Sequence, residues 1–171
     1  MPNGPIGCLI NSFAIGDFSR SSPKFNKNDL VNINANIIKK LSFEDIKGKL
    51  DSLGIKRNNV EFWNLIKNNI SYVRESYEWW NIINEKKIFY LKKRDFLKEC
   101  ASVLPKEPFT TSSWDEWLTK IKNNSDKKGS ELFMPLRLAL TGKKYGPKLK
   151  YLMPLLSRNL ILHRLGVDNG S

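Results

Sequence analysis

The chain has 171 residues, enough for one large domain or two small ones with a buried core. Its 29 lysines and arginines exceed its 17 aspartates and glutamates, which gives a net charge of +12 and a pI near 9.7. This balance predicts an anionic partner, although a lysine-rich proteome from an AT-rich genome would also raise the charge. Cys8 and Cys100 are isolated and His163 is the only histidine, so the sequence indicates no zinc site, disulfide framework or histidine-based catalytic triad.

No segment approaches the ~20 consecutive apolar residues that a transmembrane helix needs. The N-terminal sequence MPNGPIGCLINSF also lacks the basic region and long apolar run of a signal peptide. We therefore expect a soluble, cytoplasmic monomer that does not bind membranes.

The first half of the chain predicts a loop over Asp17 to Phe25 and then four helices, over residues 29–41, 42–54, 58–70 and 71–83. Asn26 or Asn28 can cap the first helix, in which Leu30, Ile33, Ile37 and Leu41 form an apolar stripe. Ser42 begins the second helix, which ends at Gly54, and Asn58 or Asn59 begins the third. The apolar spacing therefore predicts two successive helical hairpins.

Aromatic residues are dense in the predicted third and fourth helices. In the third, we expect Val60, Trp63 and Ile66 to be buried. In the fourth, helical spacing predicts one face that consists of Val73, Tyr77, Trp80 and Asn84. Trp79 and Ile83 are adjacent to this face. These rings could stack bases, but core packing between helices is the interpretation that we favour.

A charged connection over residues 85–90 separates the first half from a second set of helices. These are predicted over residues 91–104, 112–123, 130–141, 147–156 and 157–165, with Ser112 or Ser113 as a cap and Pro147 opening the fourth. No alternation typical of a β-sheet is present. The fold class is therefore all-α, with about eight helices in two packed subdomains, 1–88 and 89–171, the first truncated at its N-terminal end.

The segment from Lys128 to Leu156 is where basic charge collects. Between residues 120 and 164 the chain has eleven lysines and arginines against two acidic residues. Helical spacing predicts one buried face, from which Arg137 is displaced. The residues of that face are Leu132, Phe133, Leu136 and Leu140. Gly142 should end this helix.

The turn that follows gathers four lysines around one aromatic ring, beside the start of the next helix. They are Lys143, Lys144, Lys148 and Lys150, and the ring is Tyr145. Free N–H groups at a helix start attract anions, so the turn suits a phosphate backbone with exposed bases. Tyr145 is either a stacking platform or a cap over the hairpin core. Arg137 is a further candidate for contact with RNA.

The sequences LFMPLRLALTG, KYGPKL and LMPLL resemble the C-terminal, anticodon-binding region of bacterial glutamyl-tRNA synthetases. The resemblance extends through FSRSSPKFNKNDLVNINANIIKKL, FWNLIKNNISYVRESYEWWNII and WDEWLTKIK, and is strongest for enzymes of the alphaproteobacterial type. It implies a helical scaffold for the tRNA anticodon. The catalytic Rossmann domain of the family, with its ATP, Mg²⁺ and HIGH-like and KMSKS-like signatures, has no counterpart here. The resemblance thus implies a fragment or a split gene product with no cofactor and no catalysis of its own.

The family's anticodon contacts can be transferred to five positions. Gly146, Pro147, Leu149 and Lys150 correspond to residues that meet the first two anticodon bases. Gly146 and Lys150 replace a threonine and a phenylalanine, so Lys150 could instead pair with a phosphate. Asn69 replaces an arginine that, in some members of the family, reads the last anticodon base. The resemblance therefore implies glutamate tRNA as partner, with glutamine tRNA as a second partner if the last base is read loosely.

Two other functions remain open from the sequence. A free-standing helical module could bind tRNA or other RNA without any synthetase. An all-α interaction domain could carry the same lysines as a solvated face, with no RNA partner. Salt-dependent binding of tRNA would separate the last possibility from the other two.

Overall fold

The computed structural model describes residues 26–56, 60–90 and 92–167. Within these ranges the chain forms nine α-helices and two 3₁₀ helices, and no strand, which confirms the predicted all-α class. The α-helices are α2 (Lys27–Lys40), α3 (Phe43–Ser52), α4 (Val60–Ile66), α5 (Ser76–Asn84), α6 (Arg94–Ser102), α7 (Thr111–Asn124), α8 (Gly129–Thr141), α9 (Leu149–Leu152) and α10 (Arg158–Arg164). The 3₁₀ helices are η2 (Val73–Glu75) and η3 (Met153–Leu155).

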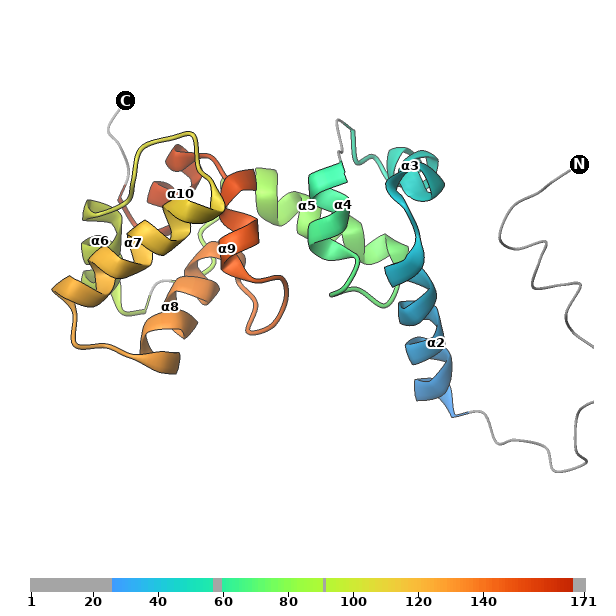
Figure 1. Ribbon diagram of the computed structural model, residues 1–171, viewed down its shortest axis with the longest axis horizontal. Coiled ribbons are helices and arrows are strands. Elements are labelled where there is room, and N and C mark those ends of the chain that lie inside the picture. Colours follow the sequence, from blue (N-terminus) through green and yellow to red (C-terminus); the bar gives the residue numbers. More distant parts are fainter. Residues whose placement is uncertain (1–25, 57–59, 91, 168–171) are drawn as a thin grey trace, which may run out of the picture.

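The helices form two groups along the long axis of the molecule. Figure 1 shows α2, α3 and α4 on one side and α6 to α10 on the other, with α5 between them. We call α2 to α5 the first bundle and α6 to α10 the second bundle, because α5 packs on α4 through the Phe62 and Trp80 rings. The predicted subdomain boundary, between residues 88 and 89, falls in the connection that leaves α5.

Helix starts follow local capping chemistry. Asn26 and Ser42 cap α2 and α3 as predicted, each in a reciprocal capping box. The predicted cap of α7 was wrong: Thr110 is the N-cap, and Ser113 is its partner three residues later. A serine three residues into a helix can mimic the glutamate of a capping box, so the true cap lay further upstream. The predicted loop 17–25 and the predicted caps Asn58 and Asn59 lie outside the described residues.

Pro147 does not open a helix, contrary to the sequence prediction. α9 begins at Leu149, with Lys148 as its N-cap in an extended conformation. Pro147 therefore belongs to the turn, where its ring is buried. This lengthens the exposed connection between α8 and α9 and leaves α9 only one turn long.

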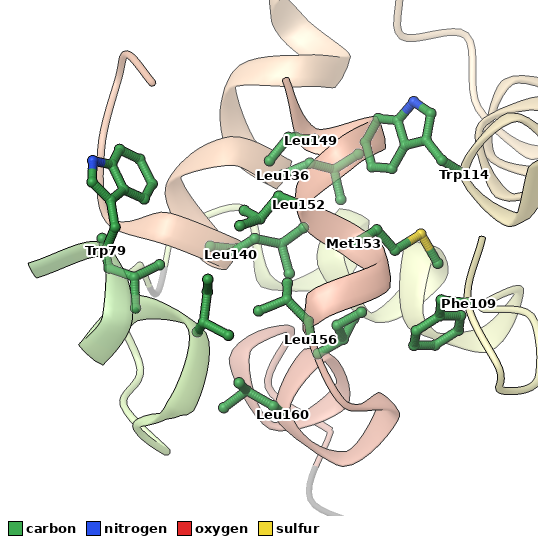
Figure 2. Close-up of a cluster of buried hydrophobic side chains, with 14 of the residues drawn as sticks. Trp79, Phe109, Trp114, Leu136, Leu140, Leu149, Leu152, Met153, Leu156 and Leu160 are labelled. Carbon is green, nitrogen blue, oxygen red and sulfur yellow. The ribbon is translucent and has the colours of Figure 1, made fainter. Parts of the chain in front are cut away.

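The second bundle is built around the contact of α8 with the α9–η3 segment. Figure 2 shows leucines of α8 and of α9 pointing toward one another, with Met153 between them and the rings of Trp114 and Phe109. Leu132, Leu136 and Leu140 are buried as predicted, whereas Phe133 is 38% exposed and was wrongly assigned to the core. A helix buries its stripe at i, i+4 and i+8, and Phe133 lies at its edge.

The first bundle packs on Trp63 and Ile66 of α4, which are buried as predicted, but Val60 is exposed. In α5 the predicted buried face is displaced from the observed one. Tyr77 is half exposed and Trp80 is only partly buried, whereas Trp79 and Ile83, predicted beside that face, are buried together with Ile82. The reason is that the chain passes through the 3₁₀ turn η2 before α5, so spacing counted from Val73 does not continue into the helix.

The apolar stripe on α2 is mostly uncovered. Leu30, Ile33 and Ile37 are 57%, 47% and 50% exposed, while Ile38 on the adjoining face is 2% exposed. α2 is attached to its bundle through Ile38 and through a hydrogen bond from the Asn34 side chain to the carbonyl of Ser71. Its N-terminal half projects away from the bundle (Figure 1).

Arg164 ties the two groups of helices together. Its side chain is fully buried and donates to Ile82 O at 2.5 Å, Glu85 O at 2.8 Å and Leu140 O at 2.7 Å. The guanidinium carbon also lies 4.8 Å from the centroid of the Phe89 ring. These carbonyls stand at the C-terminal ends of α5 and α8, where a cation is electrostatically favoured. Arg164 therefore fixes α5 against the second bundle.

Candidate nucleic-acid interface

The basic turn, residues 142–148, is anchored at its first residues by Thr141 and Gly142. The Thr141 hydroxyl donates to Arg137 O at 2.7 Å and accepts from Lys143 N at 3.1 Å. Gly142 ends α8 with a positive φ of 68°, and a Cβ there would lie 2.8 Å from the Phe89 ring. Both the conformation and the close ring favour glycine at this position.

Gly146 is confined by the first bundle. Its φ is 141°, and a Cβ built on it would lie 2.6 Å from Trp79 Cζ2 and closer still to Cη2. Trp79 is itself buried on α5. Packing against Trp79 therefore requires a glycine at position 146. This contact explains why the threonine of the family's usual pattern is not found here.

Arg137 supports the turn from inside. Its Nη2 donates to Pro147 O at 3.0 Å, and its Nη1 is buried with no hydrogen-bond partner among the described residues. Burial lowers the pKa of this guanidinium from its usual value. The structure thus places Arg137, predicted as a contact for RNA, beneath the turn that carries Pro147.

Two of the four lysines in the basic turn and in α9 form ion pairs, and two do not. Lys143 forms an ion pair with Glu78 at 2.6 Å, and Lys150 forms one with Asp115 at 2.5 Å. In the part of the chain that the structure describes, Lys144 and Lys148 have no acidic partner, and both are exposed. Lys144 and Lys148 are therefore the cations best placed to meet a phosphate.

Tyr145 is 84% exposed at the tip of the turn. It does not cap the hairpin core, which was one of the two interpretations of the sequence. Its ring borders a shallow hollow with Trp79, Asn69 and Gly146. An exposed ring in this position can accept a stacked base.

A groove of about 720 Å³ runs between the two bundles. We call it the composite groove. One wall comes from α4 and the turn after it, and the other from the basic turn, α9 and η3. Its lining residues are Glu61, Asn64, Leu65, Asn68, Asn69, Thr111, Gly146, Pro147, Lys148, Tyr151, Pro154 and Leu155.

The groove brings together four of the residues predicted from the sequence: Asn69, Gly146, Pro147 and Lys148. Leu149, in contrast, is buried in the second bundle and Lys150 is turned toward Asp115 on α7, so neither lines the groove. The sequence prediction did not include Asn64, Asn68 and Tyr151. Tyr151 could have been found from helical spacing, since it lies three residues after Lys148.

The described ranges contain no group of three or more histidine, cysteine, aspartate or glutamate residues suited to a metal ion. No helix within those ranges is long and apolar enough to span a bilayer.

Comparison with known proteins identifies the family. Residues 33–167 match the family described as "Anticodon binding domain". The chain is 37% identical over 163 residues to "Glutamate–tRNA ligase 2" of Bartonella bacilliformis, and 36% identical over 159 residues to "Glutamate–tRNA ligase 1" of Orientia tsutsugamushi. These alignments cover 93% and 92% of this chain but 36% of each ligase, so the chain spans about a third of the length of these relatives.

The fold is also found in a solved structure. A glutamate-tRNA synthetase from Elizabethkingia anophelis superposes with a TM-score of 0.71, covering 92% of this chain and 34% of that one. At 15% identity this similarity shows the fold alone. Taken with the match over residues 33–167, it shows that the chain belongs to the anticodon-binding domain family and is homologous to the C-terminal region of glutamate–tRNA ligases.

Proposed function

We propose that this chain is the anticodon-reading region of a glutamate–tRNA ligase and that it receives the unpaired anticodon bases of glutamate tRNA in the composite groove. The observation that carries the proposal is the composition of the groove. Asn69 comes from the first bundle and Gly146, Pro147 and Lys148 come from the second, and they form facing walls of one cavity. Sequence-specific recognition of RNA acts on such unstacked bases in loops.

The charge of the groove's rim fits a nucleic acid. Lys148 lines the groove and Lys144 lies on the adjoining turn, each without an acidic partner among the described residues. Each lysine that neutralises a phosphate releases counterions, so binding should weaken as salt rises. We expect these two lysines to position the RNA backbone, and the groove to discriminate the bases.

Attachment of glutamate to tRNA would take place in the catalytic region of the ligase, which would hold ATP and Mg²⁺. In this proposal the present chain contributes no catalytic group and no cofactor site. It supplies a rigid platform, since Arg164 fixes α5 against the second bundle. A monomeric chain that binds one tRNA is sufficient for this role.

Asn69 supports relaxed reading of the last anticodon base. Its Nδ2 donates to Leu65 O at 3.3 Å, so the amide is partly engaged within its own wall. A carboxamide in place of a guanidinium also offers fewer donors to a guanine or cytosine edge. We therefore propose that glutamine tRNA, which differs from glutamate tRNA at this base, is accepted as a second partner.

The test is a titration of the full chain with RNA hairpins that carry the glutamate anticodon loop, in low and moderate salt. The comparison hairpins change the first two anticodon bases or the last base alone. We expect loss of affinity when the first two bases change, and a difference of less than about fivefold when only the last base changes, below the discrimination of a bidentate base contact.

The other outcomes distinguish the alternatives. Equal binding to all hairpins, with strong salt dependence, would indicate a general RNA-binding module. No binding even at low salt would indicate a helical interaction domain with a solvated basic face. Strong rejection of the hairpin changed at the last base would overturn only the proposal about glutamine tRNA.

A further inference from the structure

The wall of the composite groove formed by α9 and η3 presents one aromatic side chain. Lys148, Tyr151 and Leu155 follow one another at helical spacing and line the groove. The alternate face of the same segment holds Leu149, Leu152 and Met153, all buried in the second bundle. Tyr151 is 53% exposed. It is the one ring that this segment turns toward the space between the bundles.

Carboxamides face this ring from the other bundle. Asn64 and Asn68 are one helical turn apart at α4 and the turn after it, and both are exposed in the groove. Within the described ranges, no hydrogen bond occupies either side chain, whereas the neighbouring Asn69 donates to Leu65 O. A carboxamide offers two donors and one acceptor to a base edge.

We propose that Tyr151 is the stacking platform for one unpaired base in the composite groove, and that Asn64 and Asn68 read the edge of that base from the facing wall. This inference rests on the proposed function and assigns a role to three further residues within it. Stacking on an aromatic ring is tolerant of sequence, since every base has a π-face. Carboxamide contacts depend on the donors and acceptors of the base edge, so they discriminate.

The structure separates this role from that of Tyr145. Tyr145 lies at the tip of the basic turn, is 84% exposed and does not line the composite groove. Tyr151 shares its groove with Pro147, Pro154 and Leu155, which give the ring apolar neighbours. A base that enters from the lysine rim would be held between this apolar wall and the asparagines.

The test compares Tyr151→Leu, Tyr151→Phe and Tyr77→Leu in the full chain, titrated with the glutamate anticodon hairpin over a range of salt concentrations. Tyr151→Leu should weaken binding about 5- to 150-fold, the loss of one stacked base. The slope of log affinity against log salt should stay unchanged because no phosphate contact is lost. Tyr151→Phe keeps the ring and should bind as the natural chain does. Tyr77→Leu is the matched control, because Tyr77 on α5 is 49% exposed and does not line the composite groove, and it should change binding by less than about twofold.

The role of Asn64 and Asn68 is tested by measuring how strongly each variant prefers the glutamate anticodon hairpin over hairpins with changed anticodon bases. Asn64→Ala and Asn68→Ala should narrow the difference in affinity between the glutamate hairpin and hairpins with changed anticodon bases, by about fivefold or more for the pair. Both side chains and Tyr151 are exposed, so unchanged thermal unfolding of each variant would exclude misfolding as the cause.

Two results would overturn the assignment: a Tyr151→Leu chain that binds as tightly as the natural one, or a loss that appears as a reduced salt slope. The assignment of Asn64 and Asn68 would be overturned if their replacement left the preference for the glutamate anticodon unchanged. The proposed function itself is tested separately, by titrating the unsubstituted chain. Equal binding of that chain to all hairpins, or no binding, would contradict the proposed function.

Discussion

The ring of Trp79 on α5 occupies the space where a side chain on Gly146 would have to be. A Cβ at Gly146 would lie 2.6 Å from Trp79 Cζ2, a separation that side-chain carbons do not show. The first bundle thereby sets the path of the basic turn that belongs to the second. The position of Pro147 and Lys148 in the composite groove follows from this contact.

Replacing Gly146 by alanine should destabilise this junction. The change forces a Cβ against Trp79 and strains a backbone with φ of 141°, which together should cost about 1–3 kcal/mol of unfolding free energy. Hairpin binding should fall as well because the groove wall shifts. Urea unfolding followed by tryptophan fluorescence measures the first effect.

Gly48→Ala is the matched control for this change. Gly48 lies inside α3 with nothing within 4 Å of its would-be Cβ, so alanine there should raise the unfolding free energy by about 0.5–1 kcal/mol. If both substitutions had the same effect, the Trp79 contact would not constrain the turn.

Arg164→Met should be strongly destabilising. It removes donors from three buried carbonyls, of Ile82, Glu85 and Leu140, and should lower the unfolding free energy by about 3 kcal/mol or more. Arg164→Lys should not restore the unfolding free energy, since an ammonium group lacks the planar fork that reaches carbonyls in several directions. Arg158→Met is the control. Among the described residues its guanidinium donates only to Leu104 O, at 3.5 Å, so its removal should cost less than about 1 kcal/mol.

Glu78→Gln and Asp115→Asn should strengthen binding of the hairpin. Each releases one lysine, Lys143 of the basic turn or Lys150 of α9, from an exposed ion pair. Since such pairs are worth about 0.2–1 kcal/mol, affinity should rise by up to about fivefold, with a steeper salt dependence. Glu44→Gln, on α3, changes the net charge equally and pairs with no lysine of the turn. If it had the same effect, the gain would reflect net charge and not release of a lysine.

Adjacent isoleucines on α2 should respond differently to truncation. Ile38→Ala should lower the unfolding free energy by about 2–4 kcal/mol because the side chain is buried. Ile37→Ala should change it by about 0.5 kcal/mol or less because the side chain is half exposed. Denaturant unfolding of the two variants provides the measurement. Similar losses would mean that the exposed stripe is covered in solution.

Cys100 gives a pH dependence of known sign. Burial raises the pKa of this thiol from 9.0 to about 12. Between pH 9 and 12 the Cys100 thiol therefore keeps its proton in the folded chain but loses it in the unfolded chain. Its contribution to the unfolding free energy is complete below pH 9 and is lost as pH rises toward 12. Relative to Cys100→Ala, the natural chain should lose unfolding free energy across this range. Parallel pH profiles for the two chains would contradict the assignment.

Local features of the fold were predictable from sequence, whereas contacts between bundles were not. Ser42 was identified as a cap, and Asn26 as one of two candidates, because capping depends on residues three positions apart. The predicted buried face of α5 was displaced because η2 interrupts the helical count. Arg164 was not recognised because two of its three acceptors lie 79 and 82 positions away in the chain. No periodic pattern reports on contacts of that kind.

The candidate site divides in the same way. Asn69, Gly146 and Pro147 could be named from the resemblance, and Lys148 from the charge of the turn, and the four residues meet in one groove. That Lys143 and Lys150 are paired with acids was not predictable, because Glu78 and Asp115 belong to other helices. The reason for glycine at position 146 also required the structure, since it is the ring of Trp79.

The buried guanidinium of Arg164 has a consequence for how recognition can evolve. The separation of the groove's walls is set by Arg164 and Trp79, neither of which lines the groove. Two domains with identical side chains in the groove could then differ in which base fits, if they differ at these hidden positions. Selectivity for a nucleotide would then depend partly on the distance between the bundles. A comparison limited to the residues that touch RNA would overlook this dependence.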